Sequence, residues 1–448
     1  MNRRDFIFGT VAASGGYAGL RALAQGTPQT AVGAAELKTD VLVCGGGPAG
    51  VAAAAMAARQ QVNVLLLERY GRLGGMAVQG LVGPLMGSCD SRFVHETLKR
   101  IGGCAFDPNR LDLQYADIVQ ESGAKLLLHT WSAEALLDGN RVTGVRAATK
   151  QGLVQISARV VVDATGDGDV AYGAGAAFEQ GRTGDRLMQP VSIMYLIGGM
   201  DEKTALLCGS EEQARRVRVP EGSWEEVVTR GQKSGELAAT VGVIRIYRSL
   251  RPGLRVVNAT QVNDVDGTKP ADLTRAELEG RRQAYQVLEF LRKHAPGYEN
   301  AVITEMPAVI GVRETRRILG EAYLTREDLT SGRRWPNAVV RSASFPMDIH
   351  NPAGSGQAEG AGAKAAQGGA TRVKPYDIPY GCLVPKETDG LLMAGRCISG
   401  SHDAHASYRV QCIAMGIGAA AGAAAALAAK HAIQPRQVDV KEIQRLRV

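Results

Sequence analysis

Apolar runs of strand length alternate with stretches of helical character at both ends of this chain. Runs rich in Val, Leu and Ile predict strands at residues 40–44, 62–68, 125–129, 158–163 and 391–396. Small-residue stretches or helical spacing predict helices at residues 51–58, 91–101, 111–123 and 412–429. A further pattern, apolar on both sides of Asp-Gly-Asn, predicts a hairpin over residues 135–145. Strands that alternate with helices predict an α/β fold around a parallel sheet.

The turn after the first predicted strand has the glycine pattern of a nucleotide-binding site. Gly45, Gly47 and Gly50 occupy G-x-G-x-x-G, and Glu68 follows at the end of the second strand. These glycines allow a tight turn, close approach of a pyrophosphate and close packing of helix on strand, while Glu68 can bind ribose hydroxyls. The alternative is a tight turn in some other α/β protein. We predict a bound dinucleotide held by Gly45, Gly46, Gly47, Pro48, Ala49, Gly50 and Glu68.

The residues directly after Glu68 distinguish between dinucleotides. Arg69 follows the acid, and a second glycine pair, Gly74 and Gly75, precedes Met76. This order resembles flavoproteins in which an acidic residue, a basic residue and Gly-Gly wrap the adenosine and pyrophosphate of FAD. NAD domains usually continue from the acid into another crossover helix. The pattern therefore favours FAD.

Two later segments are predicted to return to the cofactor. The strand at residues 158–163 runs into Ala-Thr-Gly-Asp-Gly-Asp, where glycines permit a sharp turn and Asp169 can cap the next helix. The alternative is a turn and cap alone, but the position at the end of a buried strand favours proximity to the cofactor. The helix that begins near Gln411 is expected to direct its positive end at the flavin. The predicted cofactor residues here are Thr165, Gly166, Asp167, Gly395, Arg396, Gln411 and Cys412.

The net charge bears on possible binding partners, and the N-terminal residues bear on location. The formal charge of the 448 residues is +7, but three arginines and one aspartate of residues 1–24 account for +2 of it. No basic run interleaved with aromatics occurs, which gives nucleic-acid binding little support. Arg3 and Arg4 before an apolar segment predict a twin-arginine signal peptide at residues 1–24, with the twin-arginine export machinery as a partner and a periplasmic or secreted location. That route carries folded proteins, so FAD would be loaded before export.

Composition divides the rest of the chain. Residues 25–38 are interpreted as a linker, 39–185 as the first part of an FAD-binding domain, 186–371 as an inserted α+β substrate domain, and 372–448 as the last part of the FAD-binding domain. A Gly/Ala-rich loop at residues 353–371 is either a mobile surface loop or a lid. The helix at residues 412–429 is long enough to suggest a membrane span, but its Ala and Gly favour a buried helix close to the strands. The seven cysteines form no C-x-x-C, so neither a metal site nor a required disulfide is predicted.

With these motifs in view, the chain resembles a family of bacterial FAD-dependent oxidoreductases. The similarity includes the glycine turn, Glu-Arg-Tyr-Gly-Arg-Leu-Gly-Gly-Met at 68–76, Asp-Ala-Thr-Gly-Asp-Gly-Asp-Val-Ala at 163–171, Gly-Val-Arg-Glu-Thr-Arg-Arg-Ile at 311–318 and Ala-Gly-Arg-Cys-Ile-Ser at 394–399. It implies a glutathione-reductase-like, Rossmann-type fold, FAD and redox chemistry. The chain departs from the family at Gly381, which replaces a usual Arg, at the extra histidine His405, and in the long Gly/Ala loop. All three departures are expected where substrate sits.

Redox chemistry at a C–H bond requires a base for the substrate proton and a group that stabilises the charge of reduced flavin. The resemblance makes His402 the first candidate base, and His350, near Asp348, the second; either could instead be a structural histidine. Arg409 could add positive charge at the flavin. The groups that could hold a carboxylate or hydroxyl are Arg313, Arg316 and Tyr408, although Arg313 with Glu314 could equally form a buried ion pair.

These residues predict an FAD-dependent dehydrogenase or oxidase. It would take a hydride from a small periplasmic polyol, sugar derivative or carboxylic acid to flavin N5, and electrons would pass to a quinone, a cytochrome or oxygen. One alternative is a reductase subunit that receives electrons from a separate chain. Another is a flavin-binding envelope component without catalytic activity.

Overall fold

The computed structural model describes residues 37–358 and 371–446. The predicted signal peptide, nearly all of the linker, and residues 359–370 of the Gly/Ala-rich loop lie outside the described residues. Within the described ranges, the buried apolar residues form two hydrophobic cores.

A seven-stranded sheet organises the first domain. Its order is β4-β2-β1-β7-β6-β5, and β20 pairs with the end of β7. The parallel strands are β1 (Leu37–Cys44), β2 (Val64–Leu67), β4 (Lys125–Leu127), β7 (Gly152–Asp163) and β20 (Leu391–Met393). The antiparallel hairpin is formed by β5 (Trp131–Asp138) and β6 (Arg141–Thr149). Val41 of β1 pairs with Val64 on one side and with Val160 on the other, so apolar runs 23 and 119 residues away in the chain build one buried layer with it. The predicted α/β, Rossmann-like fold is confirmed.

The helices of this domain are α1 (Pro48–Ala58), α2 (Gly75–Gln79), α3 (Arg92–Ile101), α4 (Pro108–Glu121), α5 (Asp169–Gly173), α11 (Gln411–His431) and α12 (Val440–Arg445). The most extensive helix contact is between α1 and α11. A Cβ on Gly418 would lie 2.0 Å from the carbonyl oxygen of Ala49, and one on Gly422 would lie 2.1 Å from that of Ala53. Glycine is required because the two helix backbones touch at these points.

Helix α11 is long and apolar enough to cross a membrane by length and composition, but 94% of its most apolar window is buried inside the protein. It packs against α1 and the sheet rather than presenting an apolar surface. The structure thus gives α11 the place expected of a core helix.

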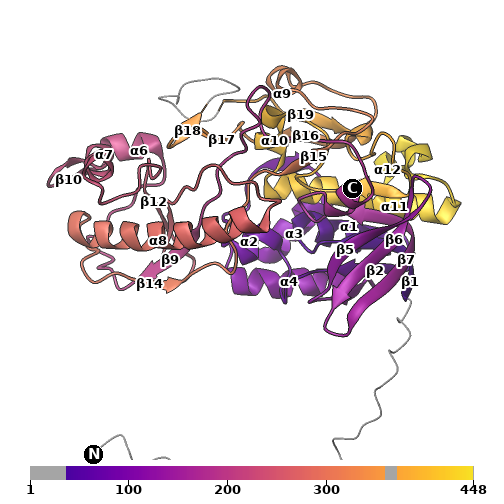
Figure 1. Ribbon diagram of the computed structural model, residues 1–448, viewed down its shortest axis with the longest axis horizontal. Coiled ribbons are helices and arrows are strands. Elements are labelled where there is room, and N and C mark those ends of the chain that lie inside the picture. Colours follow the sequence, from indigo (N-terminus) through magenta and orange to yellow (C-terminus); the bar gives the residue numbers. More distant parts are fainter. Residues whose placement is uncertain (1–36, 359–370, 447–448) are drawn as a thin grey trace, which may run out of the picture.

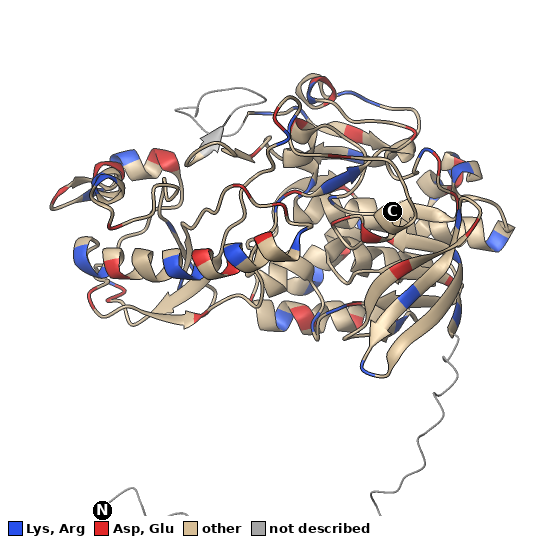
Figure 2. Cartoon of the chain, in the orientation of Figure 1, with Lys and Arg blue, Asp and Glu red and all other residues tan. Residues whose placement is uncertain are grey.

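The second hydrophobic core lies beside the first and extends from Val191 to Ile310 (Figure 1). Its antiparallel sheet has the order β12-β13-β9-β14 and consists of β9 (Met194–Gly198), β12 (Arg245–Arg248), β13 (Arg255–Asn258) and β14 (Val302–Glu305). The smaller elements are α6 (Glu211–Arg216), α7 (Trp224–Ser234), β10 (Arg218–Val219) and β11 (Gly222–Ser223). Helix α8 (Pro270–His294) packs on this sheet through Gly280, where a Cβ would lie 3.0 Å from the side chain of Ile193. Figure 2 shows charges of both signs along α8, as is typical of a solvated helix face.

From Ile318 onward the chain packs into the first core again. The composition of the sequence placed the start of the C-terminal part of the FAD-binding domain later, at residue 372. Two earlier strands, β3 (Ser88–Asp90) and β8 (Phe178–Gln180), pair with strands of this later segment. The further elements of the later segment are β15 (Arg316–Ile318), α9 (Arg326–Ser331), β16 (Ala338–Ser344), β17 (Ile349–His350), β18 (Gln357–Ala358), β19 (Tyr376–Pro379), η1 (Tyr380–Cys382), α10 (His402–Tyr408) and η2 (Pro435–Gln437). Strand β15 pairs with β8, and β16 pairs with β3 and β19. Composition could not reveal this because the segment is rich in arginine, while its assignment depends on a few buried apolar residues.

Candidate functional site

The turn between β1 and α1 is built by backbone contacts that only glycine permits. Gly45 has φ +105°, and a Cβ there would lie 2.5 Å from the carbonyl oxygen of Ala164. A Cβ on Gly50 would lie 1.7 Å from the carbonyl oxygen of Gly45. Gly47 is different, because a Cβ there would meet only Gly75 Cα within 4 Å, at an ordinary contact distance of 3.9 Å, and the position opens onto the cavity that Gly47 lines. Gly47 is the N-cap of α1 and no side chain caps the helix there.

Glu68 reaches back to this turn. The Gly46 N–H donates to Glu68 Oε2 at 2.7 Å, and the Tyr70 N–H donates to Oε1 at 2.8 Å. Burial raises the pKa of the Glu68 carboxyl against the effect of these donors. The acid therefore shapes the cradle as well as lining it, and ribose binding by Glu68 stays a prediction.

The third turn is held by Asp163, which the sequence did not single out as a site residue. Its fully buried carboxylate accepts from the Thr165 hydroxyl at 2.6 Å and from the Ala171 N–H at 2.9 Å. The Thr165 hydroxyl in turn accepts from the N–H of Asp169 at 3.0 Å. The side chain of Thr165 is thus used within the turn, although the residue lines the cavity.

Arg396 and Asp167, both predicted at the cofactor, pair with each other. Their nearest atoms are 2.5 Å apart, and the hydroxyl of Thr315 donates to the same carboxylate oxygen at 2.7 Å. This contact joins the turn after β7 to the turn after β20. Asp169, beside them, lines the cavity, and burial together with Asp167 and Asp163 raises the pKa of its carboxyl to about 6.

The start of α11 holds the loop at residues 80–87 against the site. The amide of Gln411 donates to the carbonyl of Val82 at 2.9 Å and accepts from the Met86 N–H at 3.2 Å. The N–H of Cys412 is used in the same contact, since it donates to the carbonyl of Met86 at 3.0 Å. Gln411 lines the cavity, whereas Cys412 does not.

One cavity of about 480 Å³ extends from the turns that follow β1, β7 and β20 to the second domain. The predicted cofactor residues that line it are Gly45, Gly47, Pro48, Ala49, Glu68, Arg69, Gly75, Met76, Thr165, Gly166, Gly395, Arg396 and Gln411. The predicted residues that do not are Gly46, Gly50, Gly74, Asp167 and Cys412 among the cofactor set, and Arg316, His402 and Tyr408 among the substrate-binding and catalytic set.

Beyond the turns, six arginine, histidine and carboxylate side chains line the cavity, and we call them the charged cluster: Glu211, Arg245, Arg313, Asp348, His350 and Arg409. Arg245 forms an ion pair with Glu211 across the second domain. Asp348 lies 3.5 Å from both His350 Nε2 and an Arg409 guanidinium nitrogen. Arg245 and Glu211 carried no sequence signal, because neither belongs to a motif.

The protonation states of this cluster follow from its charges. Burial and the repulsion of Arg313 lower the pKa of His350 to about 4, although Asp348 opposes this. Burial alone would raise the pKa of Asp348, but His350, Arg409 and Arg313 outweigh it and hold that pKa far below its usual range. At neutral pH, His350 is therefore a neutral imidazole beside an ionised carboxylate.

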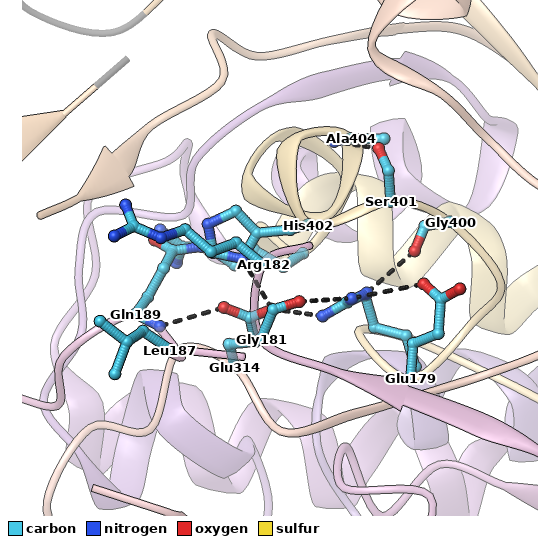
Figure 3. A network of polar contacts seen from close by, with 12 residues as sticks. Glu179, Gly181, Arg182, Leu187, Gln189, Glu314, Gly400, Ser401, His402 and Ala404 are labelled. Atoms are coloured by element: carbon cyan, nitrogen blue, oxygen red, sulfur yellow. Dashed lines mark hydrogen bonds and ion pairs between the residues drawn. The ribbon is translucent and has the colours of Figure 1, made fainter. Parts of the chain in front are cut away.

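His402, the first candidate base, lies in a different environment. Its Nδ1 is 2.9 Å from Oε1 of Glu314, a carboxylate with 0% of its side chain exposed (Figure 3). Arg317 binds the same carboxylate. His402 Nε2 is buried and has no hydrogen-bond partner among the described residues. The structure brings His402 to Glu314 and not to the cavity lining.

Other expectations are corrected in the same region. The Tyr408 hydroxyl donates to the carbonyl of Ile398 at 2.9 Å, inside the core, so it cannot hold a substrate in this arrangement. Glu314 pairs with Arg317 and His402, not with Arg313. Arg316 binds Asp169 at 3.0 Å and lies over the ring of Tyr172, outside the lining.

Two of the three family departures also lie away from the cavity. A Cβ on Gly381 would lie 2.9 Å from the backbone nitrogen of Ala322, so close backbone packing explains this glycine. His405 is buried edge-to-face against Tyr408, and burial lowers its pKa well below the usual value. Neither residue contacts the cavity, contrary to the expectation that they mark the substrate position. The third departure lies mostly outside the described residues.

A sequence model of the family described as FAD dependent oxidoreductase matches residues 40–446. The chain belongs to this family. Its cavity fits the cofactor: glycines from successive turns line it, and Gly47 leaves open space at the start of α1, where a phosphate is best placed. Thus FAD is the cofactor, and the protein is an enzyme of the oxidoreductase class.

Relatives match only part of the chain. A digeranylgeranylglycerophospholipid reductase 2 from Methanopyrus kandleri is 29% identical over 150 residues, covering 29% of this chain and 38% of that protein. A thiamine thiazole synthase from Methanococcus aeolicus is 32% identical over 154 residues, covering 30% of this chain and 58% of that protein. Both matches therefore span less than two thirds of these relatives' own lengths.

Solved structures show a distant likeness of fold. A geranylgeranyl bacteriochlorophyll reductase-like protein from Thermoplasma acidophilum aligns with a TM-score of 0.47 at 13% identity, covering 92% of this chain and 83% of that chain. An L-proline dehydrogenase from P. horikoshii aligns with a TM-score of 0.41 at 12% identity, covering 87% and 93%.

Proposed function

We propose that this FAD-dependent oxidoreductase oxidises a small polar metabolite that lies between the glycine turns and the charged cluster. The observation that supports this most directly is the single cavity lined by both groups of residues. Bound FAD supplies the redox chemistry of such a reaction by accepting a hydride. The chain itself must bind the substrate, orient it and accept its proton.

His350 is the residue best placed to accept the proton. It lines the cavity and is neutral at pH 7, because burial and Arg313 lower its pKa to about 4. Asp348, 3.5 Å from Nε2, can stabilise the imidazolium that forms, and Arg409 holds Asp348 from the other side. We assign His402 a positioning role through Glu314. The Glu314 carboxylate accepts the Gln189 N–H at 3.0 Å, and Gln189 Oε1 accepts the backbone N–H of His350 at 3.2 Å.

The location and the electron acceptor are part of the proposal. The twin-arginine pattern at residues 1–24 favours export through the twin-arginine machinery and a periplasmic substrate. A nicotinamide acceptor is then unsuitable, so a quinone, a cytochrome or oxygen would take the electrons. The glutathione-reductase-like arrangement implied by the family resemblance belongs to the same proposal.

The test is anaerobic absorbance of the FAD-loaded mature protein during addition of polyols, sugar derivatives and carboxylic acids. We expect one class to bleach the flavin band near ~450 nm. His350→Gln should bind FAD normally but slow the bleaching by roughly 100-fold or more, because the proton loses its acceptor. Normal bleaching by His350→Gln would refute the role of His350.

A reaction in the reductive direction is the second candidate. Two of the relatives are named as reductases, but each of them matches only 29% of this chain. If no metabolite bleaches the flavin while a reduced viologen does, the reductase hypothesis replaces dehydrogenation. Flavin that no metabolite oxidises or reduces would favour the non-catalytic alternative.

A further inference from the structure

The charged cluster contains more positive than negative charge. Among the described residues, its three guanidinium groups face two carboxylates, and His350 is neutral at pH 7. Arg245 is paired with Glu211, and Arg409 shares Asp348 with His350. One positive charge is therefore left uncompensated on the cavity wall.

Arg313 carries that charge. No carboxylate among the described residues forms an ion pair with its guanidinium, although the charge of Asp348 acts on it, and its Nη1 donates to the backbone carbonyl of Pro190 at 2.6 Å. That bond fixes the position of the group without neutralising it. Arg313 also lines the cavity, so its remaining donors are available to a ligand.

Arg409 is incompletely satisfied beside it. One of its terminal nitrogens donates to the carbonyl of Asp348 at 3.1 Å, but its Nε is buried and has no hydrogen-bond partner among the described residues. A buried donor without a partner costs free energy, which a bound acceptor would recover. Arg313 lies in the field of Arg409: burial and the charges of Arg409 and Arg245 lower the pKa of Arg313 to about 9, although Asp348 opposes this. An anion between Arg313 and Arg409 offsets this field.

We propose that the substrate carries a carboxylate group and that Arg313 and Arg409 bind it. This inference rests on the proposed function, and it selects the carboxylic acids from its three substrate classes. Guanidinium groups match the planar geometry of a carboxylate through paired N–H donors. The excess of one positive charge favours a substrate with a single carboxylate. His350 lies on the same wall, so a carboxylate held there places the rest of a small substrate beside the proposed proton acceptor.

The experiment measures binding to the FAD-loaded protein by the change in the visible flavin spectrum, without turnover. Three pairs of probes match in shape and differ in charge: acetate with acetamide, lactate with lactamide, and benzoate with benzamide. We expect at least one carboxylate to bind roughly 10-fold or more tightly than its amide. Equal binding of acid and amide in all three pairs, or no binding of any acid, would overturn the proposal.

Variants then assign the effect. Arg313→Met should weaken the binding of that carboxylate roughly 10- to 100-fold and leave amide binding unchanged, and Arg313→Lys should fall in between. Arg248→Gln is the control, because Arg248 is exposed on β12, the strand of Arg245, and does not line the cavity. If Arg313→Met binds no FAD, Arg409→Met is measured for the same loss. If both arginine variants bind the carboxylate as tightly as the control does, the proposal is refuted.

The result is separable from that of the proposed function. Carboxylates that bind without ever bleaching the flavin would support the anion site while removing the dehydrogenase function. Bleaching by neutral sugars or polyols, with no carboxylate binding, would support the function and overturn the anion site.

Discussion

Replacing Glu314 by Gln should destabilise the protein strongly, because this carboxylate is the shared acceptor of a buried network. Its side chain is 0% exposed, and it accepts from Arg317, from His402 Nδ1 at 2.9 Å and from the Gln189 N–H at 3.0 Å. Burial alone would raise the pKa of Glu314, but His402 and Arg317 outweigh it and lower the pKa, so the group is ionised at neutral pH.

The magnitude depends on the partners that the substitution leaves to Arg317. The Arg317 side chain is 2% exposed and keeps the carbonyls of Gly400 and Gly181 at 2.9 and 2.8 Å, but its nearest remaining carboxylate is Glu179 at 3.6 Å. A buried charge that loses its main partner costs about 3–5 kcal/mol. The free energy of unfolding of a whole protein is about 5–15 kcal/mol, so this cost is a large fraction of the total stability.

The assay is urea unfolding at a fixed, saturating FAD concentration, because ligand binding contributes to apparent stability. Glu134→Gln is the matched control: Glu134 also binds an arginine, Arg146, at 2.7 Å, but the two side chains are 55% and 43% exposed. We expect the control to change stability by less than about 1 kcal/mol. If Glu314→Gln also stays within about 1 kcal/mol of the wild type, the buried network does not stabilise the fold.

Two further predictions concern the cofactor cradle and pH. Gly47→Val should fold but purify with little flavin, because its side chain would fill the open space at the start of α1, whereas Gly50→Ala should lower the yield of folded protein because its Cβ would clash with Gly45. Circular dichroism measures folding and flavin absorbance measures the bound cofactor. A Gly47→Val protein that purifies with its full flavin content would contradict the first expectation. His350 has a pKa of about 4 when folded against 6.5 when unfolded, so the unfolded state binds more protons between these pH values and stability falls as the pH is lowered. In urea unfolding, the wild type should lose about 3 kcal/mol more stability than His350→Gln between pH 7 and pH 4. Parallel pH profiles of stability for the two proteins would contradict this.

The cofactor half of the site could be predicted because its signals are local. The strand, the glycine turn and the acid at Glu68 fall within about 30 consecutive residues, and the structure places Gly45, Gly47 and Glu68 on one cavity wall. Even here the roles of single residues required coordinates. Asp163 is the first residue of the motif at 163–171, but only the structure shows that its buried carboxylate holds the turn.

The choice between the two histidines shows where sequence reasoning ended. The family resemblance ranked His402 before His350, but neither spacing nor residue type separates the two. The structure places His350 at the cavity and His402 against Glu314. That difference depends on how β17 and α10 pack, which is set by contacts between distant segments.

The amino-acid sequence by itself determined the α/β fold, the FAD cradle and the buried character of α11, because each depends on neighbouring residues whose periodicity, size or backbone freedom has one physical consequence. Only the tertiary structure decided the composition of the charged cluster. Arg245, Arg313, Asp348 and Arg409 are separated by up to 164 positions in the chain and belong to no common motif. Their proximity arises from the packing of the second domain against the first, and a separation along the chain does not specify a distance in space.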